Sequence, residues 1–356
     1  MSGVALAGGY MADFLLGDPP HLHPVAGFGK LALHAEGVAY APTRSRGIAY
    51  TGILVGLAAV GGELTARAAA RAGVGRGTVL AAATWASLGG RSLTRAAGRL
   101  AEHIEADDLD AARAMLPWLC GRDPQALDAD GLSRAALESV AENTSDAVVG
   151  ALLWGTLAGP GGVLAYRAAN TLDAMIGHRS ARYADFGWAA ARLDDLVNWP
   201  AARLAAVLTV LCAPLVGGTR RQTWQTVLRD GAKHPSPNAG RVEAAFAGAL
   251  RVRLGGPLTY AGVRELRPRI GDGDRRTPTP ADVHRATRLS LAVGALSAVT
   301  CAGVRALVLK LHRRTAARPP LPDLHRRTAA PPSLPDLHRR TATRPPLPEL
   351  PRGAGA

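Results

Sequence analysis

The sequence contains few cysteines and few aromatic residues. Its three cysteines, Cys120, Cys212 and Cys301, are far apart, and no CxxC spacing occurs. The sequence therefore supports neither a structural zinc site nor a disulfide framework. Aromatic residues make up only 4% of the chain, so rings that could stack on nucleic-acid bases are scarce. We therefore expect no nucleic-acid partner, although the formal net charge is +14.

Familiar nucleotide-binding and hydrolase signatures are also missing. No GxxxxGK(S/T) loop is present, because GVGRGT at 73–78 lacks the lysine. No GxSxG elbow and no HExxH zinc helix occurs either. Long alternating runs of β-branched residues, which would indicate strands, are nearly absent. These absences exclude the common phosphate-loop motif and favour a helical protein.

Long apolar stretches are the main feature that is present, and apolar residues make up 47% of the chain. A membrane helix needs about 20 predominantly apolar residues. The strongest candidates are 48–62, 147–166, 201–217 and 289–309, and the weaker ones are 3–17 and 78–90. Glycine and alanine are abundant in them, as at close helix contacts in membranes. We expect an all-α, polytopic integral membrane protein with about four to six membrane helices; the alternative is a soluble protein with alanine-rich core helices.

Polar segments separate these stretches. Residues 91–145 have the pattern of amphipathic helices, and 167–200 and 220–285 are rich in Asp, Asn, Arg and His. The chain ends in a Pro/Arg-rich segment that begins LHRRTAARPPLPD at 311–323 and repeats with a period of 13 residues. Such a repeat cannot build a core. We therefore divide the chain into a membrane-embedded domain, 1–310, and a disordered tail, 311–356.

The stretch ESVAENTSDAVVGALLW at 138–154 places three carboxylates on one helical stripe. Glu138, Glu142 and Asp146 follow at steps of four and lie within about 80° of arc. Like charges at this spacing destabilise a helix by roughly 0.2–0.5 kcal/mol per pair. A cation is therefore expected to offset them, either a metal ion, an arginine or a charged ligand. The alternative is a solvated helix end.

The segment 165–204 carries the densest set of polar groups. Arg167, Asn170 and Thr171 share a helix face, and Asp173 lies one turn further on. The remaining polar candidates in this segment are Arg182, Arg192, Asp194, Asp195 and Asn198. Carboxylate and amide oxygens suit Mg²⁺, and arginines bind phosphate oxygens. The pattern indicates a Mg²⁺–phosphate site, and a network of structural salt bridges is an equal alternative.

Two further turns contain candidate ligands. GDPPHLHPV at 17–25 combines Asp18 with His21 and His23, which could bind a metal or simply cap the turn. The second turn precedes a helix and could present N–H groups to an anion, or be an ordinary capped loop. Its candidate side chains are Lys233, His234, Ser236 and Asn238.

Taken in order, these segments resemble one family of membrane enzymes. GDPPHLHPV, ALESVAENTSDAVVGALLW, the segment 165–204 and HPSPNAGRVEAAFAGALRVRLGGP are similar to the adenosylcobinamide-phosphate synthases of late cobalamin (vitamin B12) biosynthesis. The resemblance covers about residues 3–310, which makes this the catalytic domain. Ser145 is a small departure, because an apolar residue is more usual there.

The resemblance implies an ATP-dependent amide ligation. Adenosylcobyric acid and (R)-1-aminopropan-2-ol phosphate would be joined to give adenosylcobinamide phosphate, with ATP and Mg²⁺ as cofactors. It further implies a multi-pass protein of the cell membrane with cytoplasmic polar segments. Its partners would be the two substrates and the lipid bilayer, and other late cobalamin-pathway membrane enzymes are conceivable.

Within the matched motifs we assign roles by residue type. The candidate catalytic residues are Glu142, Asp146, Asp173, Asp194, Asp195 and His234, of which Asp173, Asp194 and Asp195 are the metal candidates. The candidates for binding substrate or phosphate are Asp18, His23, Asn143, Arg167, Asn170, Arg182, Arg192, Asn198, Lys233, Ser236 and Asn238.

Two other functions remain open at this stage. A non-catalytic scaffold for late cobalamin enzymes would need only the spans. A corrinoid transporter would use a broken helix, for which LAGPGGVLAYR at 157–167 is a candidate. Transport would also need charged residues inside the spans, whereas most charged residues are expected outside them, which favours chemistry at one membrane face.

Overall fold

The computed structural model describes residues 2–18, 23–178, 180–260, 263–271 and 276–316. The chain divides into two compact units, Met1–Lys310 and Leu311–Ala356, and the following description concerns the first. Residues 311–316 of the predicted tail form the end of the last helix. The rest of the predicted tail lies outside the described residues.

The described residues form helices, one strand pair and short helical turns. The helices are α1 (Ser2–Leu16), α2 (Pro24–Ala39), α3 (Arg44–Arg71), α4 (Arg76–Ser87), α5 (Gly90–Glu105), α6 (Leu109–Met115), α7 (Ala129–Thr144), α8 (Gly150–Ile176), α9 (Trp188–Cys212), α10 (Arg220–Asp230), α11 (Ala239–Leu250) and α12 (Pro280–Ala316). The strands are β1 (Leu254–Tyr260) and β2 (Val263–Ile270). The turns are η1 (Leu116–Trp118), η2 (Pro124–Ala126), η3 (Ser145–Val149) and η4 (Ala213–Val216).

Four helical segments are long and apolar enough to cross a membrane. They are Arg44–Arg71, Ala129–Ile176, Trp188–Val216 and Pro280–Leu311. These segments contain the four strongest stretches predicted from the sequence, so the prediction of an all-α polytopic membrane protein is confirmed. The outer face of α3 shows why: Ile53, Leu57, Val60 and Leu64 recur at three- and four-residue steps and are all exposed. Such a stripe suits contact with lipid.

The stretch 147–166 does not form one straight span. The chain leaves the helical conformation at Gly159, with φ 65° and ψ −151°, just before Pro160. A Cβ on Gly155 would lie 2.8 Å from Val163, and one on Gly150 would overlap the ring of Tyr166. From Gly150 to Gly155 along the first arm, the facing residue of the second arm changes from Tyr166 back to Val163. The two arms of α8 therefore run antiparallel. α8 is therefore a helical hairpin, because proline cannot continue the helix and glycine accepts the positive φ.

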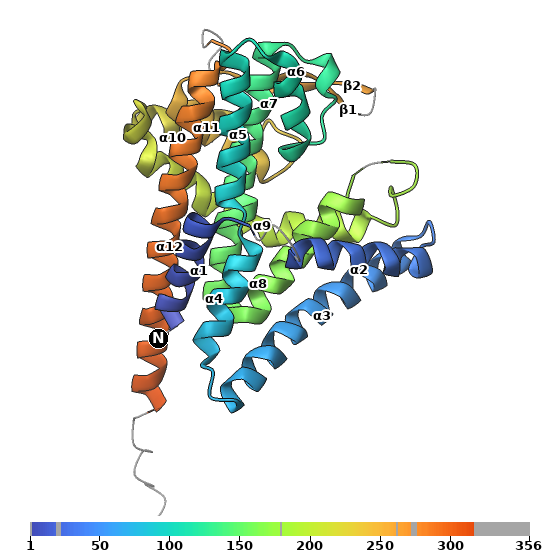
Figure 1. Ribbon diagram of the computed structural model, residues 1–356, viewed down its shortest axis with the longest axis vertical. Helices are drawn as coiled ribbons and strands as arrows, with labels where there is room; N and C mark the ends of the chain where they lie inside the picture. Colours follow the sequence, from blue (N-terminus) through green and yellow to red (C-terminus); the bar gives the residue numbers. More distant parts are fainter. Residues whose placement is uncertain (1, 19–22, 179, 261–262, 272–275, 317–356) are drawn as a thin grey trace, which may run out of the picture. The chain divides into compact units, whose positions relative to one another are not determined.

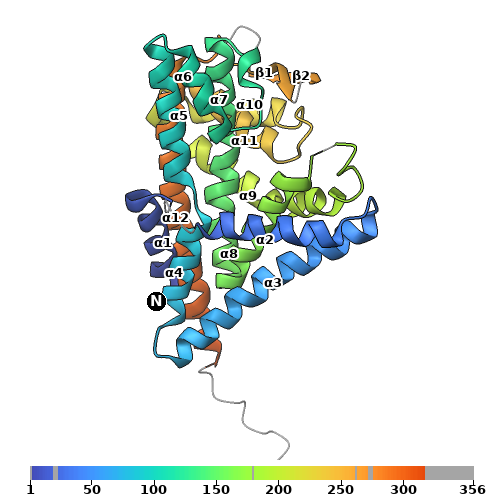
Figure 2. The ribbon, with the colours of Figure 1, turned by 45° about the vertical axis from the view of Figure 1, so that its right-hand side comes forward.

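A polar cap covers one end of the spanning helices. In Figure 1, α5, α6, α7, α10, α11 and the strand pair lie at that end, and α3 and α4 extend to the other, while α12 runs alongside both. The same separation is visible after a 45° turn (Figure 2). The cap has its own core, to which α5, α7, α11 and α12 contribute Leu100, Leu137, Phe246 and Leu289. The prediction of amphipathic helices over 91–145 is thus confirmed.

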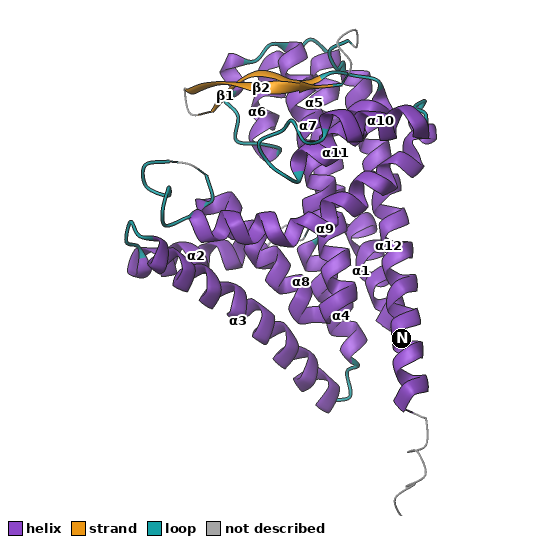
Figure 3. Cartoon of the chain, turned by 180° about the vertical axis from the view of Figure 1, so that it is seen from behind, coloured by secondary structure: helices purple, strands orange, loops and turns teal. Residues whose placement is uncertain are grey.

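The strand pair is an element that the sequence analysis did not predict. β1 and β2 are antiparallel, with Leu254 opposite Ile270 and an irregularity between Leu254 and Gly256. Figure 3 shows the pair lying across the cap, where β1 contacts α7 and β2 contacts α11. Both end residues, Leu254 and Ile270, are fully buried in the cap core. The strands were missed because packing of two terminal residues, rather than a long β-branched pattern, holds them in place.

The close approach of α8 to α3 gives a first prediction. A Cβ on Gly161 would lie 2.6 Å from the backbone oxygen of Ala59, so Gly161→Ala should lower the unfolding free energy by about 1–3 kcal/mol. Gly61→Ala is the matched control, because nothing lies within 4 Å of its Cβ and alanine favours a helix by roughly 1 kcal/mol. Thermal unfolding in detergent measures both. Equal midpoints for the two variants would contradict the tight helix contact.

Candidate active site

A π-helical turn marks the centre of the site. Residues Ser145–Val149 form this turn between α7 and α8. Such turns are rare and are frequent at functional sites. The carbonyl of Asp146 in this turn accepts a hydrogen bond from the Tyr166 hydroxyl at 2.9 Å. Ser145, the residue that departs from the family pattern, is buried here, and its Oγ has no hydrogen-bond partner among the described residues.

A chain of hydrogen bonds links α8 to α9 at the same level. The Tyr166 hydroxyl also lies 2.5 Å from Asn198 Oδ1, so its single proton can be donated either to this oxygen or to the carbonyl of Asp146. Asn198 Nδ2 then donates to Asp194 Oδ1 at 2.9 Å, and Asn170 Nδ2 reaches the same oxygen at 3.3 Å. Arg167 Nη1 donates to Asn170 Oδ1 at 3.1 Å. The predicted residues Arg167, Asn170, Asp194 and Asn198 are therefore brought together.

Four carboxylates converge on this chain of hydrogen bonds. Asp146 interacts electrostatically with Asp194, Glu142 and Asp173, and Arg167 faces it as a cation. The four come from the end of α7, the π turn, the last turns of α8 and the start of α9. Glu142 and Asp146 are only partly buried, so each keeps some access from outside. The arrangement gathers four carboxyl groups, with Arg167 facing Asp146 and with Arg267 and Arg122 facing Glu142.

All four of these groups lie on segments long enough to cross the membrane: Ala129–Ile176 carries Glu142, Asp146 and Asp173, and Trp188–Val216 carries Asp194. The expectation that most charged groups lie outside the spans is thus wrong for the centre of the site. The helical pattern places their side chains on the same faces as buried alanine and glycine residues. These carboxylates come close to one another only because the α8 hairpin turns back and α9 crosses beside it.

The donor chemistry of this centre suits Mg²⁺. Among the described residues, no three or more His, Cys, Asp or Glu side chains converge to hold a metal ion. Mg²⁺ rarely needs such a cage, since it usually takes one or two carboxylates together with water and substrate phosphates. Asp146, Asp173 and Asp194 offer carboxylates, and Asn170 and Asn198 offer amides. The assignment of the metal to Asp173, Asp194 and Asp195 stays a prediction.

A second cluster lies in the cap, beside the first. Glu138 forms a buried ion pair with Arg122, and its Oε1 accepts the N–H of Gly255 at 2.6 Å. The carboxylates of the predicted stripe therefore have different surroundings. Glu138 is paired with an arginine, whereas Glu142 faces Arg267, Arg122 and Asp194. Glu142 therefore connects the two clusters. This explains how the helix tolerates three carboxylates at steps of four.

His234 is the imidazole of the cap cluster. Its Nδ1 accepts the N–H of Ser236 at 3.0 Å, and its Nε2 lies 2.8 Å from Arg267 Nη1 and 3.7 Å from Glu243 Oε1. Burial, followed by the charge of Arg267, lowers the pKa of His234 to about 4. Burial and the charges of Glu138 and Glu142 raise the pKa of Glu243 well above its usual value. His234 is thus neutral near pH 7, and Glu243 favours its protonated form.

The turn before α11 holds a structural cap. Ser236 Oγ accepts the N–H groups of Asn238 at 3.3 Å and Ala239 at 3.2 Å. Asn238 ties the turn to α9, because its Nδ2 donates to the carbonyl of Asp195 at 2.8 Å and its Oδ1 accepts from Arg203 at 2.7 Å. Two N–H groups of this turn therefore already have a partner within the turn, as expected for the alternative of a capped loop.

Several predicted residues bind partners away from the carboxylate centre. Arg182 Nη2 donates to Glu36 at 2.8 Å, next to α2. Lys233 contacts the buried Asp230 at 2.7 Å. Burial opposes the charge of Asp230, but bonds from Arg229, Lys233 and the Gly271 N–H outweigh it and lower its pKa to about 2. These pairs hold the fold together, and a role of Arg182 or Lys233 in binding substrate stays a prediction.

Most of the other predicted residues have partners that are close in sequence. Arg192 pairs with Asp195 at 3.3 Å, and Asn143 Nδ2 donates back to the carbonyl of Ser139 at 3.0 Å. His23 Nδ1 accepts the N–H of Val25 at 3.2 Å and caps α2. Asp18 lies near the site, since its charge interacts with that of Arg167. His21 lies outside the described residues.

Sequence reasoning missed three residues of the site. Tyr166 precedes Arg167, and its four-residue spacing to Asn170 was a signal that could have found it. Arg267 and Arg122 gave no such signal, because β2 and the loop before α7 reach the site only through tertiary packing.

Fold and site together define a polytopic helical membrane protein with a charged centre where the spans meet a polar cap. The chain belongs to the CobD/Cbib protein family, whose sequence model matches residues 6–290. It is therefore a protein of cobalamin biosynthesis.

Relatives with established names support this assignment. The chain is 53% identical over 291 residues to the cobalamin biosynthesis protein CobD of Mycobacterium tuberculosis, which covers 82% of this chain and 92% of the relative. It is 42% identical over 288 residues to the CobD of Chromobacterium violaceum, covering 78% and 89% of the two chains. The CobD of Pelobacter propionicus is 40% identical over 272 residues, covering 75% and 84%. No solved structure matches the chain.

Removal of the Tyr166 hydroxyl tests the hydrogen-bonded chain. Tyr166→Phe leaves the buried Asn198 without its donor, which should lower the unfolding free energy by about 1–3 kcal/mol. Tyr40→Phe is the matched control, because its hydroxyl bond to the carbonyl of Arg182 is exposed and worth little. Unfolding in detergent compares the two. Losses of equal size would show that the Tyr166 bond does not stabilise the fold.

The low pKa of His234 predicts a dependence on pH. The unfolded chain binds a proton at this histidine near pH 6.5, but the folded chain binds it only near pH 4. Stability from this group is therefore full above about pH 6.5 and is lost as the pH falls toward 4, by up to ~3 kcal/mol. The unfolding midpoint of His234→Gln should fall less over this range than that of the wild type. Parallel curves would contradict a buried neutral imidazole.

Proposed function

We propose that the protein is an ATP-dependent amide ligase that joins adenosylcobyric acid to (R)-1-aminopropan-2-ol phosphate and releases adenosylcobinamide phosphate. The observation that carries the proposal is the convergence of Glu142, Asp146, Asp173 and Asp194 beside Arg167 in a CobD/Cbib family member. These carboxylates suit two cationic groups, the Mg²⁺ ion that accompanies ATP and the ammonium group of the amine. The amide donors and Arg167 suit phosphate oxygens.

The chemistry has two steps. A propionate carboxylate of adenosylcobyric acid attacks the terminal phosphorus of ATP, ADP leaves, and an acyl phosphate forms. The amine nitrogen then attacks the acyl carbon, inorganic phosphate leaves, and the amide forms. The amine enters as an ammonium ion and must first lose a proton to a base. Each step needs cations that hold developing negative charge and groups that orient the reactants.

The residues of the carboxylate centre fit the first step. Mg²⁺, held by one or two of the carboxylates of Asp146, Asp173 and Asp194 together with substrate phosphates, would neutralise phosphate charge. Arg167 is held by Asn170 at 3.1 Å, and its Nε is buried without a hydrogen-bond partner among the described residues, so it keeps a donor for a phosphate oxygen. Asn198 and Tyr166 keep Asp194 in place. The triphosphate of ATP would thereby be held in place before the propionate carboxylate attacks it.

The residues between the two clusters fit the second step. Glu142 faces Asp194 on one side and Arg267 and Arg122 on the other, and it keeps partial exposure. We assign it as the base that takes the ammonium proton. Glu243 and the neutral His234 lie next in the cap and can pass the proton on. The cap would lie in the cytoplasm and the spans in the cell membrane, because ATP and the corrinoid precursor are cytoplasmic.

A corrinoid transporter is the second candidate, and one observation favours it. The helix break at Gly159 lies in a predicted span, and buried charges accompany it, as in many transporters. A transporter would move a corrinoid without consuming ATP at this site. The scaffold alternative has no comparable observation.

Membranes that carry this protein alone test the ligase. They receive adenosylcobyric acid, aminopropanol phosphate and Mg-ATP, and mass spectrometry weighs the corrinoid. We expect the condensed product, one ADP per amide, and no product without ATP. Ethanolamine phosphate and free aminopropanol in parallel identify the amine. Absence of product with inserted, intact protein would overturn the proposal and favour a scaffold, and corrinoid uptake without product would favour a transporter.

Carboxylate variants test the residue roles in the same assay. Asp194→Asn and Asp173→Ala should lower turnover at least ~100-fold, because charge stabilisation at the reacting phosphate is lost. Asp185→Asn is the matched control, since this exposed carboxylate pairs with Arg44 and lies outside the charged centre. The amount of protein in the membrane is compared for all variants. Near-normal turnover in both site variants would rule out the metal assignment.

A further inference from the structure

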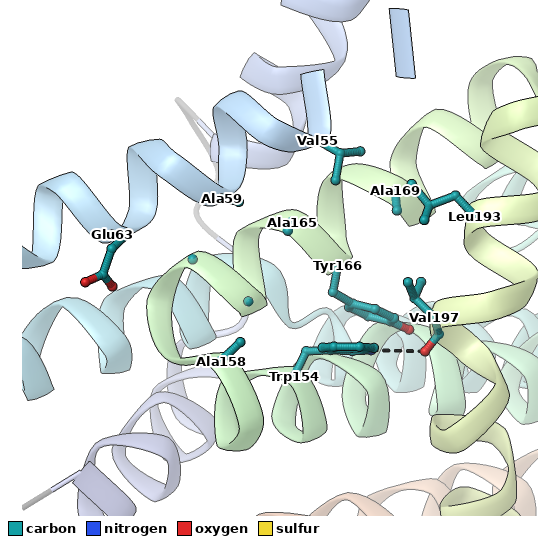
Figure 4. A pocket seen from close by; sticks show the side chains of 12 residues that line it. Val55, Ala59, Glu63, Trp154, Ala158, Ala165, Tyr166, Ala169, Leu193 and Val197 are labelled. Carbon is teal, nitrogen blue, oxygen red and sulfur yellow. Dashed lines mark hydrogen bonds between the residues drawn. The ribbon is translucent and has the colours of Figure 1, made fainter. Parts of the chain in front are cut away.

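An apolar groove lies between α3, α8 and α9. Its volume is about 460 Å³, within the range of about 300–1,000 Å³ that is usual for small-molecule sites. Val55 and Ala59 of α3 form one wall, and Trp154 and Ala165 of the α8 hairpin form the opposite wall. Val197 of α9 lies at the end away from Glu63 (Figure 4).

The polar groups of the lining are already satisfied. The indole N–H of Trp154 donates to the carbonyl of Val197 at 3.0 Å, and the Tyr166 hydroxyl faces Asn198. Glu63 accepts from Arg76 at 2.8 Å and from Arg67 at 3.1 Å. The groove therefore offers apolar surface and requires no polar contact from an occupant. A void there would forfeit dispersion contacts along its length.

The groove lies among membrane helices. All three of its walls belong to the segments Arg44–Arg71, Ala129–Ile176 and Trp188–Val216, which are long and apolar enough to span. Exposed aliphatic side chains such as Leu57 and Leu157 flank it. Hydrocarbon chains of the bilayer are thus the apolar ligand present at the highest concentration around it.

Charge at one end identifies the class of lipid. Glu63 carries one negative charge, and Arg67 and Arg76 carry two positive charges. The excess of one positive charge matches the phosphodiester of a phospholipid. Both arginines are at least half exposed, so they remain accessible to a headgroup. A neutral sterol or a free hydrocarbon would leave this charge unused.

We propose that the groove between α3, the α8 hairpin and α9 binds one acyl chain of a bilayer phospholipid, with its phosphate at Arg67 and Arg76. The chain fills the space between α3 and the hairpin arm that carries Tyr166. It therefore holds the membrane wall of the charged centre in place. The proposal does not depend on the reaction that this centre performs.

Photo-crosslinking tests the proposal on the full-length protein in lipid nanodiscs. The probe is a phosphatidylglycerol with a diazirine in one acyl chain, and peptide mass spectrometry locates the labelled residues. We expect labels on the groove segments around Trp154 and Ala165, together with labels on the exposed face of α12 at Val299 and Val304 from surrounding lipid.

Variants from opposite walls separate the groove from the lipid annulus. Ala59→Leu and Ala165→Leu each fill the groove and should reduce groove labelling at least ~10-fold, while labelling of α12 stays unchanged. Either variant suffices if the other fails to fold. Ala58→Leu is the matched control, because Ala58 is on the same helix but does not line the groove.

Three outcomes would overturn the proposal. The first is labelling of α12 without labelling of the groove. The second is groove labelling that neither filling variant reduces, or that Ala58→Leu reduces equally. The third is loss of groove labelling when saturating adenosylcobyric acid is added, which would make the groove a substrate site instead.

Discussion

Carboxylates held close together where apolar helices meet a polar cap are the constraint on which the rest of the structure depends. Glu142, Asp146, Asp173 and Asp194 interact with one another, and Arg167 faces them. Removal of charges from water costs several kcal/mol per ion unless partners compensate. The amides of Asn170 and Asn198 meet part of this cost. The arginines Arg167, Arg122 and Arg267 compensate another part.

Two departures from regular helix bring these carboxylates to one level. The π turn at Ser145–Val149 frees the carbonyl of Asp146 for Tyr166. The break at Gly159 then turns α8 back on itself, so that Asp173 returns to the side from which Asp146 came. A single straight helix would carry these two residues about 40 Å apart. The hairpin therefore serves the site, and it also creates the apolar groove against α3.

The cap completes the site from segments that are distant in sequence. Glu138 and Glu142 sit one helical turn apart, but Glu138 is neutralised by Arg122 while Glu142 faces both clusters. The strand pair delivers Arg267 to His234, whose pKa is lowered to about 4. A protonatable Glu243 beside a neutral His234 gives the cap the means to handle a proton. Under the proposed amide ligation, the carboxylate centre would serve the phosphate step and the cap the proton transfer, so the two steps would have separate surroundings.

The sequence by itself determined the class of the protein. Its four strongest apolar stretches, the amphipathic pattern of 91–145 and the long polar motifs were sufficient for an all-α membrane fold in a cobalamin-related family, because hydrophobicity and local periodicity are properties of neighbouring residues. It also found Arg167, Asn170, Asp194 and Asn198, which lie close together at helical spacing or in one motif. Only the tertiary structure decided that 147–166 is a hairpin, that Arg182 and Lys233 pair with Glu36 and Asp230, and that Arg267 and Glu243 meet His234. These outcomes depend on contacts between residues far apart in the chain, and local pattern carries no record of such contacts.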